Sequence, residues 1–395
     1  MKDIIQRKIQ RIRGKIQRIR DDKRLLPARA FKKIGLMKHY VYLKTIILYT
    51  NTICNAKCSF CDIGIENIKN PKSGGAGNLG IARMEKNSFM STEMVETILN
   101  DKAILNRRLA FGIIMTEPLI SPNITDIVKL IKSRQHSVLI TTNGFLLKKK
   151  AQGLVDAGVD RIQVSLDGTS ELHNKIRGVK NLYEKAIDGI NTIKNLNPNI
   201  HVRVNVTVVC ENQDNLVKLA DDLNQRTTID RLKFQLMQFV TNEMSERQNR
   251  LTPIEQTISS ISNQAELNRI DSKVLLNQFS ILRKKQPTYQ NIGQILFIPS
   301  LTKQVDIDNW YRTSKPLSHN DHCYIPFNQV AIKPNGEITW HMRCFDYSIG
   351  NILEGSLDYV FYKSDRVKFF RNELENNNYC MPACSRCCGV TSSGN

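Results

Sequence analysis

KTIILYTNTICNAKCSFC, residues 44 to 61, is an apolar run followed at once by three cysteines, Cys54, Cys58 and Cys61. Three thiolates on one loop can hold three irons of a cubane [4Fe–4S] cluster and leave the fourth iron open to a substrate or cofactor. An electron-transfer cluster, by contrast, normally has four cysteine ligands. The C-x3-C-x2-C spacing matches neither the cysteine run of bacterial ferredoxins nor the paired C-x2-C of a zinc site. The stretch therefore predicts a strand that leads into an iron–sulfur site with one open iron; a purely structural metal site is the alternative.

The cysteine loop from Ile53 to Cys61 resembles the signature loop of the radical S-adenosylmethionine (SAM) enzymes, including the aromatic Phe60 before the third cysteine. In that family the open iron chelates the methionine part of SAM. One electron then cleaves the sulfonium, and the resulting 5′-deoxyadenosyl radical abstracts a hydrogen atom from the substrate. The resemblance implies a [4Fe–4S] cluster on the three cysteines, SAM as the second cofactor, and a reductant such as flavodoxin or ferredoxin as a partner.

Residues 44–240 alternate between short apolar runs and amphipathic stretches, which predicts parallel βα units. Ser91 is a plausible helix N-cap, and Gly158 follows a predicted helix at the position typical of a C′ glycine. The right-handed crossover rule predicts that the units curl into an α/β fold, a partial (βα)6 TIM-like barrel, with the cysteine loop at the carboxyl edge of the sheet. Predicted strands are 44–50, 109–115, 137–142, 161–166, 201–209 and 231–238; predicted helices lie near 91–100, 123–134, 146–157, 182–197 and 213–226.

Turns that follow the next three predicted strands also resemble family motifs. Met115-Thr116-Glu117-Pro118 is similar to the Gly-Gly-Glu-Pro segment, although Met115 and Thr116 replace the two glycines. Thr142-Asn143-Gly144 and Ser165-Leu166-Asp167-Gly168 are similar to the Thr-Asn-Gly and Ser-Leu-Asp-Gly turns, and Arg177-Gly178 to an Arg-Gly pair near the SAM carboxylate. Each dipeptide alone is an ordinary turn sequence; their order along the chain carries the resemblance. It implies the following SAM-binding residues: Phe60, Thr116, Glu117, Asn143, Ser165, Asp167 and Arg177.

A second cysteine group lies in residues 321–395, which resemble the small SPASM or twitch-type auxiliary-cluster domain of many radical SAM enzymes. Residues 329–340 read as a β-hairpin around Pro334-Asn335-Gly336. The resemblance implies one auxiliary [4Fe–4S] cluster, and a zinc ribbon is the alternative. The expected ligands are Cys323, Cys344, Cys384 and Cys387, with Cys380 able to replace one of them; the choice among Cys380, Cys384, Cys387 and Cys388 stays open.

The first 45 residues hold 15 Lys or Arg and 3 Asp or Glu, a net charge of +12 out of +20 for the chain. Ile5, Ile9, Ile12, Ile16 and Ile19 follow the spacing of one helical stripe. We expect a basic amphipathic helix over 1–43, which packs on the barrel, contacts an anionic membrane peripherally or binds a partner. A nucleic-acid partner is disfavoured because no aromatic residues are interleaved with the charges. Residues 241–320 are polar and weakly periodic, with a capped helix start at Thr252 to Glu255; we expect them to bridge the two cysteine regions and contact substrate.

These features predict a radical SAM oxidoreductase that oxidises or epimerises a small polar, carbohydrate-type substrate. Alternatives are a peptide-modifying or nucleic-acid-modifying radical enzyme and, from another class, a non-enzymatic metal protein. Too few residues precede the barrel for an obvious peptide-recognition domain. Cys210 belongs to neither metal group and follows a predicted strand, so it is the candidate catalytic hydrogen-atom donor, although a buried structural cysteine is the commoner case. Ten cysteines without a secretion signal predict a reducing cytoplasmic setting, with possible contact to a membrane surface.

Overall fold

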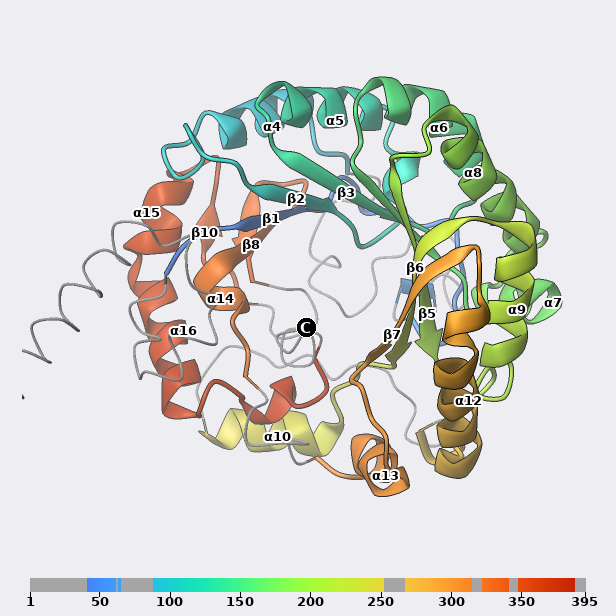
Figure 1. The fold of residues 1–395 in the computed structure, drawn as a ribbon. Coiled ribbons are helices and arrows are strands. Elements are labelled where there is room, and N and C mark those ends of the chain that lie inside the picture. The colour runs from blue at the N-terminus through green and yellow to red at the C-terminus, as the bar shows by residue number, and fades with distance from the viewer. Residues whose placement is uncertain are drawn as a thin grey trace, which may run out of the picture.

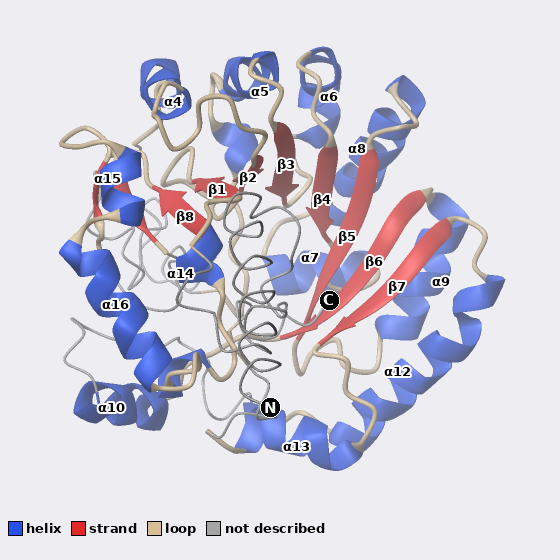
Figure 2. Ribbon diagram, turned by 60° about the vertical axis from the view of Figure 1, so that its left-hand side comes forward, coloured by secondary structure: helices blue, strands red, loops and turns tan. Residues whose placement is uncertain are grey.

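Ten strands form one curved sheet in the order β10-β9-β8-β1-β2-β3-β4-β5-β6-β7. The computed structural model describes residues 41–61, 63–64, 88–251, 267–314, 322–340 and 347–387. In Figures 1 and 2 a row of helices lies along the outside of the curved sheet. The strands are β1 (Thr45–Leu48), β2 (Ala110–Ile113), β3 (Ser137–Thr142), β4 (Arg161–Ser165), β5 (His201–Val208), β6 (Ile229–Leu236), β7 (Ile292–Ile298), β8 (Gln329–Ile332), β9 (Glu337–Thr339) and β10 (Gly350–Asn351).

The helices begin and end close to the predicted boundaries where the sequence carries capping signals. Ser91 caps its helix by accepting a hydrogen bond from the Met94 amide, and Gly158 has a φ of 81°, both as expected. One helix of the barrel, α7, was not predicted. The helices are α4 (Thr92–Leu99), α5 (Ile124–Ser133), α6 (Leu147–Asp156), α7 (Ser170–Arg177), α8 (Leu182–Leu196), α9 (Leu216–Arg226), α10 (Asn242–Leu251), α12 (Ser272–Lys285), α13 (Gln304–Arg312), α14 (Ile325–Asn328), α15 (Leu357–Tyr362) and α16 (Asp365–Asn376), with short 3₁₀ turns η3 (Pro118–Ile120), η4 (Gln286–Thr288) and η5 (Pro382–Cys384).

The predicted α/β partial barrel is confirmed, because β1 to β6 are neighbours in chain order and all pair in parallel. The sheet extends further than predicted at both ends. β7 pairs in parallel with β6, although it lies in the 241–320 segment for which we expected no strand. At the other end β8 pairs in parallel with β1, with Ile47 opposite Ala331. Both additions cover strand edges that would otherwise leave backbone groups unpaired.

The hairpin predicted for residues 329–340 is confirmed. β8 and β9 are antiparallel, and Gly336 in the turn has a φ of 83°, a conformation that glycine adopts without strain. Because β8 also pairs with β1, this hairpin is part of the barrel sheet and not of a separate layer. The second cysteine region is therefore built directly beside the strand that carries the first cysteine loop.

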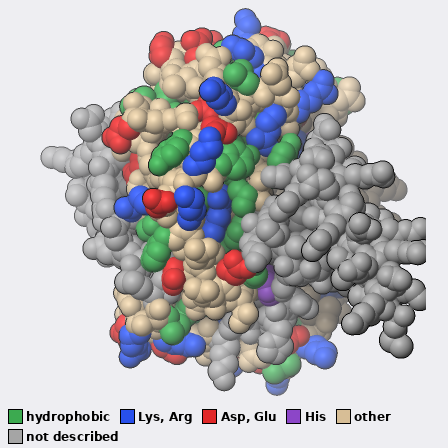
Figure 3. Space-filling view, turned by 90° about the vertical axis from the view of Figure 1, so that its left-hand side faces the viewer, with side chains coloured by type: hydrophobic (Ala, Val, Ile, Leu, Met, Phe, Trp, Pro, Cys, Tyr) green, Lys and Arg blue, Asp and Glu red, His purple; other side chains and the backbone are tan. Residues whose placement is uncertain are grey.

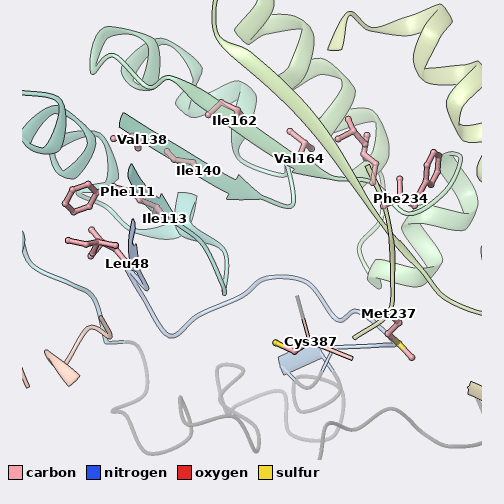
Figure 4. Packing of buried hydrophobic residues seen from close by; sticks show 14 of the residues in the cluster. Leu48, Phe111, Ile113, Val138, Ile140, Ile162, Val164, Phe234, Met237 and Cys387 are labelled. Carbon is pink, nitrogen blue, oxygen red and sulfur yellow. The ribbon is translucent and has the colours of Figure 1, made fainter. Parts of the chain in front are cut away.

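The main hydrophobic core fills the layer between the strands and the surrounding helices. Figure 4 shows side chains of β1 to β4 in this layer, among them Leu48, Phe111, Ile140 and Val164, which are fully buried. Along β3, β4 and β5 buried residues alternate with half-buried ones. The alternation places one face of each strand against the helices and the other toward the inside of the barrel. Residues 1–40 and 252–266, which include the basic helix and the Thr252 cap predicted from sequence, lie outside the described residues.

Candidate functional site

The cysteine loop leaves the carboxyl end of β1 and is held by the end of α7. The Lys57 amide donates to the carbonyl oxygen of Arg177 at 2.9 Å, and the Ser59 amide donates to that of Ile176 at 3.0 Å. Gly178 follows in a left-handed conformation, and a Cβ atom there would lie 2.8 Å from Lys57 Cβ. The glycine of the Arg-Gly pair thus allows the close packing that fixes the loop.

The three cysteine side chains lie close enough to influence one another electrostatically. Burial raises the pKa of the Cys54 thiol, and proximity to Cys58 and Cys61 raises it further. Burial likewise raises the pKa of Cys58 to about 12, against the effect of the Arg177 guanidinium, whose Nη1 lies 3.6 Å from Cys58 Sγ. Without a bound cation the Cys54 and Cys58 thiols are therefore held in the protonated form. A metal that binds them would displace the protons.

This donor set fits the triplet side of a cubane cluster. Cys54 and Cys61 are partly buried against an apolar group on the inner side of the barrel, formed by Ile47, Tyr49, Ile63 and Ala331. Within the described ranges, no three Cys, His, Asp or Glu side chains gather as they would around a single metal ion. A cubane cluster does not need its ligands to converge on a single metal ion, because each of the three thiolates binds a different iron.

Arg177 is buried beside the loop and is neutralised by Asp167. Its Nε donates to Asp167 Oδ2 at 2.5 Å, and its guanidinium lies 5.4 Å from the Phe60 ring centre. The second oxygen of Asp167 accepts from the Thr207 amide at 2.8 Å, so the carboxylate also joins β4 to β5. This pair brings three of the predicted SAM-binding residues, Phe60, Asp167 and Arg177, to one place next to Cys58.

Glu117 joins the turns after β2 and β3. One carboxylate oxygen accepts from Thr142 Oγ1 at 2.6 Å and from the Leu119 amide, and the other accepts from the Asn143 amide at 2.7 Å. Burial raises the pKa of Glu117 to about 6 despite these hydrogen bonds. Asn143 in turn donates from Nδ2 to Asn55 Oδ1 at 2.7 Å, which links the β3 turn to the cysteine loop. The Glu117 carboxylate is thus already bound by protein donors, and its role in binding SAM stays a prediction.

Met115 and Thr116 occupy the positions of the two family glycines in different ways. Met115 has a φ of 94°, a value that is strained for any residue with a side chain. Thr116 donates from Oγ1 to the backbone and side-chain oxygens of Asn51, at 2.9 and 2.8 Å. Met115 therefore adopts the backbone conformation that a glycine would adopt. At Thr116 the side chain instead fixes the turn through its hydrogen bonds to Asn51.

Cys210 and Ser165 lie at neighbouring parts of the carboxyl edge. Ser165 ends β4, is half-buried and pairs with Asn205 of β5. Cys210 follows β5, and its Sγ lies 3.1 Å from Glu211 Oε2, while Glu211 Oε1 accepts from Ser59 Oγ at 3.4 Å. Glu211 connects the candidate hydrogen donor to the cysteine loop and was missed from sequence, because nothing local marks a single glutamate after a strand.

The described members of the second cysteine group, Cys323, Cys380, Cys384 and Cys387, come from two segments. Cys323 donates from its amide to the Tyr379 carbonyl oxygen at 2.7 Å, which places it beside Cys380. Cys384 and Cys387 lie in and after η5, joined by a backbone hydrogen bond of 3.0 Å. Cys323, Cys384 and Cys387 are buried, as thiolate ligands of a cluster in an apolar setting would be, and Cys380 is partly buried. Cys344 and Cys388 lie outside the described residues, so the choice of ligands stays a prediction.

No helix in the described ranges is long and apolar enough to cross a membrane. On the face that carries α15 and α16, the Lys and Arg side chains of the described surface are interspersed with apolar and acidic ones (Figure 3). The predicted membrane contact was assigned to the basic N-terminal segment, nearly all of which lies outside the described residues, and it stays a prediction.

Comparison with known families gives two matches. Residues 48–223 match the model of the radical SAM superfamily, and residues 323–388 match that of an iron–sulfur cluster-binding domain, SPASM. The first match contains the cysteine triplet and every predicted SAM-binding residue. The second contains Cys323, Cys344, Cys380, Cys384 and Cys387.

Curated relatives resemble about two fifths of the chain. A probable GTP 3′,8-cyclase of Methanococcus aeolicus is 34% identical over 167 residues, which are 40% of this chain and 50% of the relative. A GTP 3′,8-cyclase of Campylobacter fetus is 29% identical over 170 residues, 42% of this chain and 48% of the relative. The chain thus spans about half the length of the curated relatives it matches.

Solved structures share the fold over most of the chain. Streptococcus suis SuiB bound to S-adenosylmethionine has a TM-score of 0.56 at 19% identity, and the match covers 86% of this chain and 70% of SuiB. Native anSMEcpe with bound AdoMet has a TM-score of 0.58 at 14% identity, covering 88% of this chain and 91% of anSMEcpe. At these identities the likeness concerns the fold alone.

Proposed function

Since the chain is a radical SAM enzyme with a C-terminal SPASM domain, we propose that it abstracts a hydrogen atom from a small polar, carbohydrate-type substrate and returns one to the opposite face, an epimerisation. One observation carries the proposal: the predicted SAM-binding turns and a non-ligand cysteine meet around the cysteine loop at one edge of the barrel. Once bound, the reduced cluster and SAM supply the radical that removes the substrate hydrogen. The chain contributes the ligands, the orientation and the second hydrogen atom.

Side chains from the cysteine loop and from the turns after β2 to β4 would hold the cluster and SAM. Cys54, Cys58 and Cys61 would bind the first cluster. Arg177, held in place by its ion pair with Asp167, keeps Nη1 beside Cys58, where the resemblance implies the SAM carboxylate, so it could donate charge-assisted hydrogen bonds to that group. Glu117 fixes the turn that carries Asn143. A second cluster on the C-terminal cysteines and a reductant such as flavodoxin or ferredoxin complete the proposed electron supply.

Cys210 is the proposed donor of the returning hydrogen atom. Donation breaks the S–H bond, forms a C–H bond on the substrate and leaves an unpaired electron on sulfur. One electron from the external reductant and one proton restore the thiol. Glu211, whose Oε2 lies 3.1 Å from the sulfur, is placed to deliver that proton. Without such a donor the substrate radical would lose an electron to the second cluster, and the reaction would be a two-electron oxidation.

A small polar substrate is supported by the inner face of the barrel. Half-buried Gln163, Asn205, Thr207 and Gln235 of β4, β5 and β6 share this face. Amide and hydroxyl groups of this kind hydrogen-bond to hydroxyl-rich ligands. By contrast, the inner side near β1 and β8 is apolar, with Ile47 and Ala331.

The sequence similarity to curated relatives favours a second candidate, cyclisation of GTP. The relatives carrying that name match about two fifths of this chain and about half of their own length. Incubating the reduced protein with GTP and SAM decides this candidate. GTP that remains intact while SAM is cleaved retires it.

Formation of 5′-deoxyadenosine tests the superfamily chemistry. Anaerobically reconstituted, reduced protein should convert SAM into 5′-deoxyadenosine and methionine, and Cys58→Ala should abolish this conversion. Cys210→Ala should retain the iron content of the wild type, since Cys210 is not a proposed ligand. Absence of 5′-deoxyadenosine from fully reconstituted wild-type protein would refute the proposal.

Turnover in heavy water tests the role of Cys210. Return of hydrogen from a solvent-exchanged thiol should place one deuterium on a product carbon. Oxidation should place none and should give a product two mass units lighter than the substrate. Cys210→Ala should convert the first outcome into the second. An unchanged rate and product in this variant would exclude Cys210 as donor and make oxidation the preferred reaction.

A further inference from the structure

Three arginines from successive strands project onto the inner face of the barrel. Arg203 of β5 lies directly opposite Arg231 of β6, and Arg161 of β4 lies opposite His201, two residues before Arg203 on the same face. All three are half-buried, and they alternate with fully buried residues such as Ile162, Val204 and Leu232.

The buried partners show which way the arginines face. Val202, Val204 and Leu232 belong to the main core together with residues of α8 and α9, such as Ile190 and Leu219. In Figures 1 and 2 these helices lie on the outer side of β4 to β7. Because successive side chains of a strand point to opposite faces, Arg161, Arg203 and Arg231 face the inside of the barrel.

The strands around this cationic cluster place no acidic side chain on the same face. No residue of β3, β4, β5 or β7 is acidic, and Asp230 of β6 alternates to the outer side. There it accepts from Lys194 Nζ at 2.8 Å and from the Val202 amide at 2.7 Å. In the part of the chain that the structure describes, no carboxylate forms an ion pair with any of the three arginines.

The electrostatics agree with the geometry. Burial, together with the positive charges of Arg231 and Arg161, lowers the pKa of Arg203; the charge of Asp230 opposes this shift without reversing it. Two weak polar contacts, from Arg161 Nη2 to Ser137 Oγ at 3.5 Å and from Arg203 Nε to His201 Nδ1 at 3.4 Å, use little of their hydrogen-bonding capacity. Five donors per guanidinium therefore remain largely available for a ligand.

We propose that Arg161, Arg203 and Arg231 form an anion site inside the barrel that binds a phosphate group of the substrate. The inference rests on the proposed function and names the substrate as a phosphorylated small molecule. Like charges in register across strands oppose folding, so a compensating anion is the physical reason for keeping them together. Guanidinium forks match phosphate oxygens in pairs, and three of them suit a multiply charged phosphate better than a single carboxylate.

The position of the site fits a substrate that reaches from the cofactor into the barrel. Ser165, one of the predicted SAM-binding residues, lies in register with Asn205 and through it with Lys233 of β6. The Arg203–Arg231 pair lies two residues deeper, which is about 7 Å along a strand. A substrate whose carbon framework lies at the level of Ser165 would extend its phosphate to the arginines.

Binding of inorganic pyrophosphate to the full-length protein at low ionic strength tests the site. Calorimetry should give a measurable Kd for the wild type, and Arg203→Gln and Arg231→Gln should each weaken it about tenfold or more, as loss of charge-assisted hydrogen bonds predicts. Arg250→Gln is the matched control, because Arg250 is an exposed residue of α10 outside the barrel; its Kd should equal that of the wild type. Removing one of the clustered positive charges should leave the unliganded melting temperature unchanged or higher.

Other outcomes would overturn the proposal. Equal Kd values in all four proteins would place the pyrophosphate on the outer surface, and no binding to the wild type would remove the site. Tighter binding of succinate than of pyrophosphate would exclude a phosphate group as the ligand. A lower melting temperature of Arg203→Gln with an unaltered Kd would assign the arginine to structure. Cleavage of SAM by the wild type is measured in a separate assay. If SAM is not cleaved, the proposed function is rejected, whereas the result of the pyrophosphate binding experiment still stands.

Discussion

Arg386 Nε donates a hydrogen bond of 2.5 Å to the carbonyl oxygen of Trp310, and both side chains are buried. Nη2 of the same guanidinium donates to the carbonyl oxygens of Asn309 and Thr313, each at 2.7 Å. These carbonyls lie at the end of α13, where backbone acceptors run out of partners within the helix, although that of Asn309 also accepts from the Thr313 amide at 3.3 Å. Trp310 Nε1 donates to the Met237 carbonyl oxygen at 3.1 Å, just beyond β6. Arg386 therefore joins the segment that carries Cys384 and Cys387 to α13, and through Trp310 to the barrel.

Arg386→Met should lower the free energy of unfolding by about 3 kcal/mol, because it removes the guanidinium donors of the Trp310 and Thr313 carbonyl oxygens. It should also release Cys384 and Cys387 from their positions and lower the iron content by about half. Anaerobic urea denaturation and iron analysis measure the two effects. Arg250→Met, an exposed change on α10, is the control and should alter neither. Normal iron content in the Arg386 variant would show that the cysteine pair is positioned independently.

The two cysteine groups should hold one cubane each. Reconstituted protein should contain about eight irons, since each cubane has four. Replacing Cys54, Cys58 and Cys61 together by Ala should leave about four, because the buried C-terminal cysteines lie on other segments. Metal analysis and Mössbauer or electron paramagnetic resonance spectra report the result. Zinc retained at the second group in place of iron would contradict the assignment.

Met115→Gly should be more stable than Met115→Ala by about 1–2 kcal/mol. Both variants lose the same thioether contacts, but only glycine accepts a φ of 94° without strain. The comparison of the two variants isolates backbone strain from side-chain packing, and thermal or urea denaturation measures it. If alanine is as stable as glycine, the left-handed conformation of this residue carries no cost.

His136 should make the protein less stable as the pH falls from about 6.5 to 4. Burial, followed by the charges of Arg134 and Lys132, lowers the pKa of His136 to about 4, and its Nδ1 accepts a hydrogen bond from the Leu109 amide. The unfolded chain takes up a proton near pH 6.5, whereas the folded chain does not. The stability contributed by this group is therefore complete above pH 6.5 and lost toward pH 4, by about 2–3 kcal/mol.

His136→Asn supplies the reference for this measurement, because asparagine can accept the same hydrogen bond without titrating. The difference in unfolding free energy between the wild type and this variant should shrink as the pH decreases. A difference that stays constant from pH 7 to 4 would show that His136 is protonated equally in both states.

Local sequence patterns were sufficient for β1 to β6 and for most of the helices between them. Alternating apolar residues, a serine N-cap at Ser91 and a C′ glycine at Gly158 are features that a short window contains. The β7 strand was missed because Gly293 and Gln294, both exposed, interrupt its apolar pattern. α7 was missed because its buried positions include His173 and Arg177, which are polar in sequence and which both contact Asp167 in the fold.

The sequence by itself determined the chemistry, because cluster ligation and turn geometry depend on residues a few positions apart. The spacing of Cys54, Cys58 and Cys61 is of this kind. The tertiary structure alone decided what depends on register between distant segments. It placed β8 against β1, Arg386 against Trp310, Glu211 between Cys210 and Ser59, and Arg203 opposite Arg231. Strand pairing brings residues nearly thirty or more positions apart into contact, and no local window of the chain contains that information.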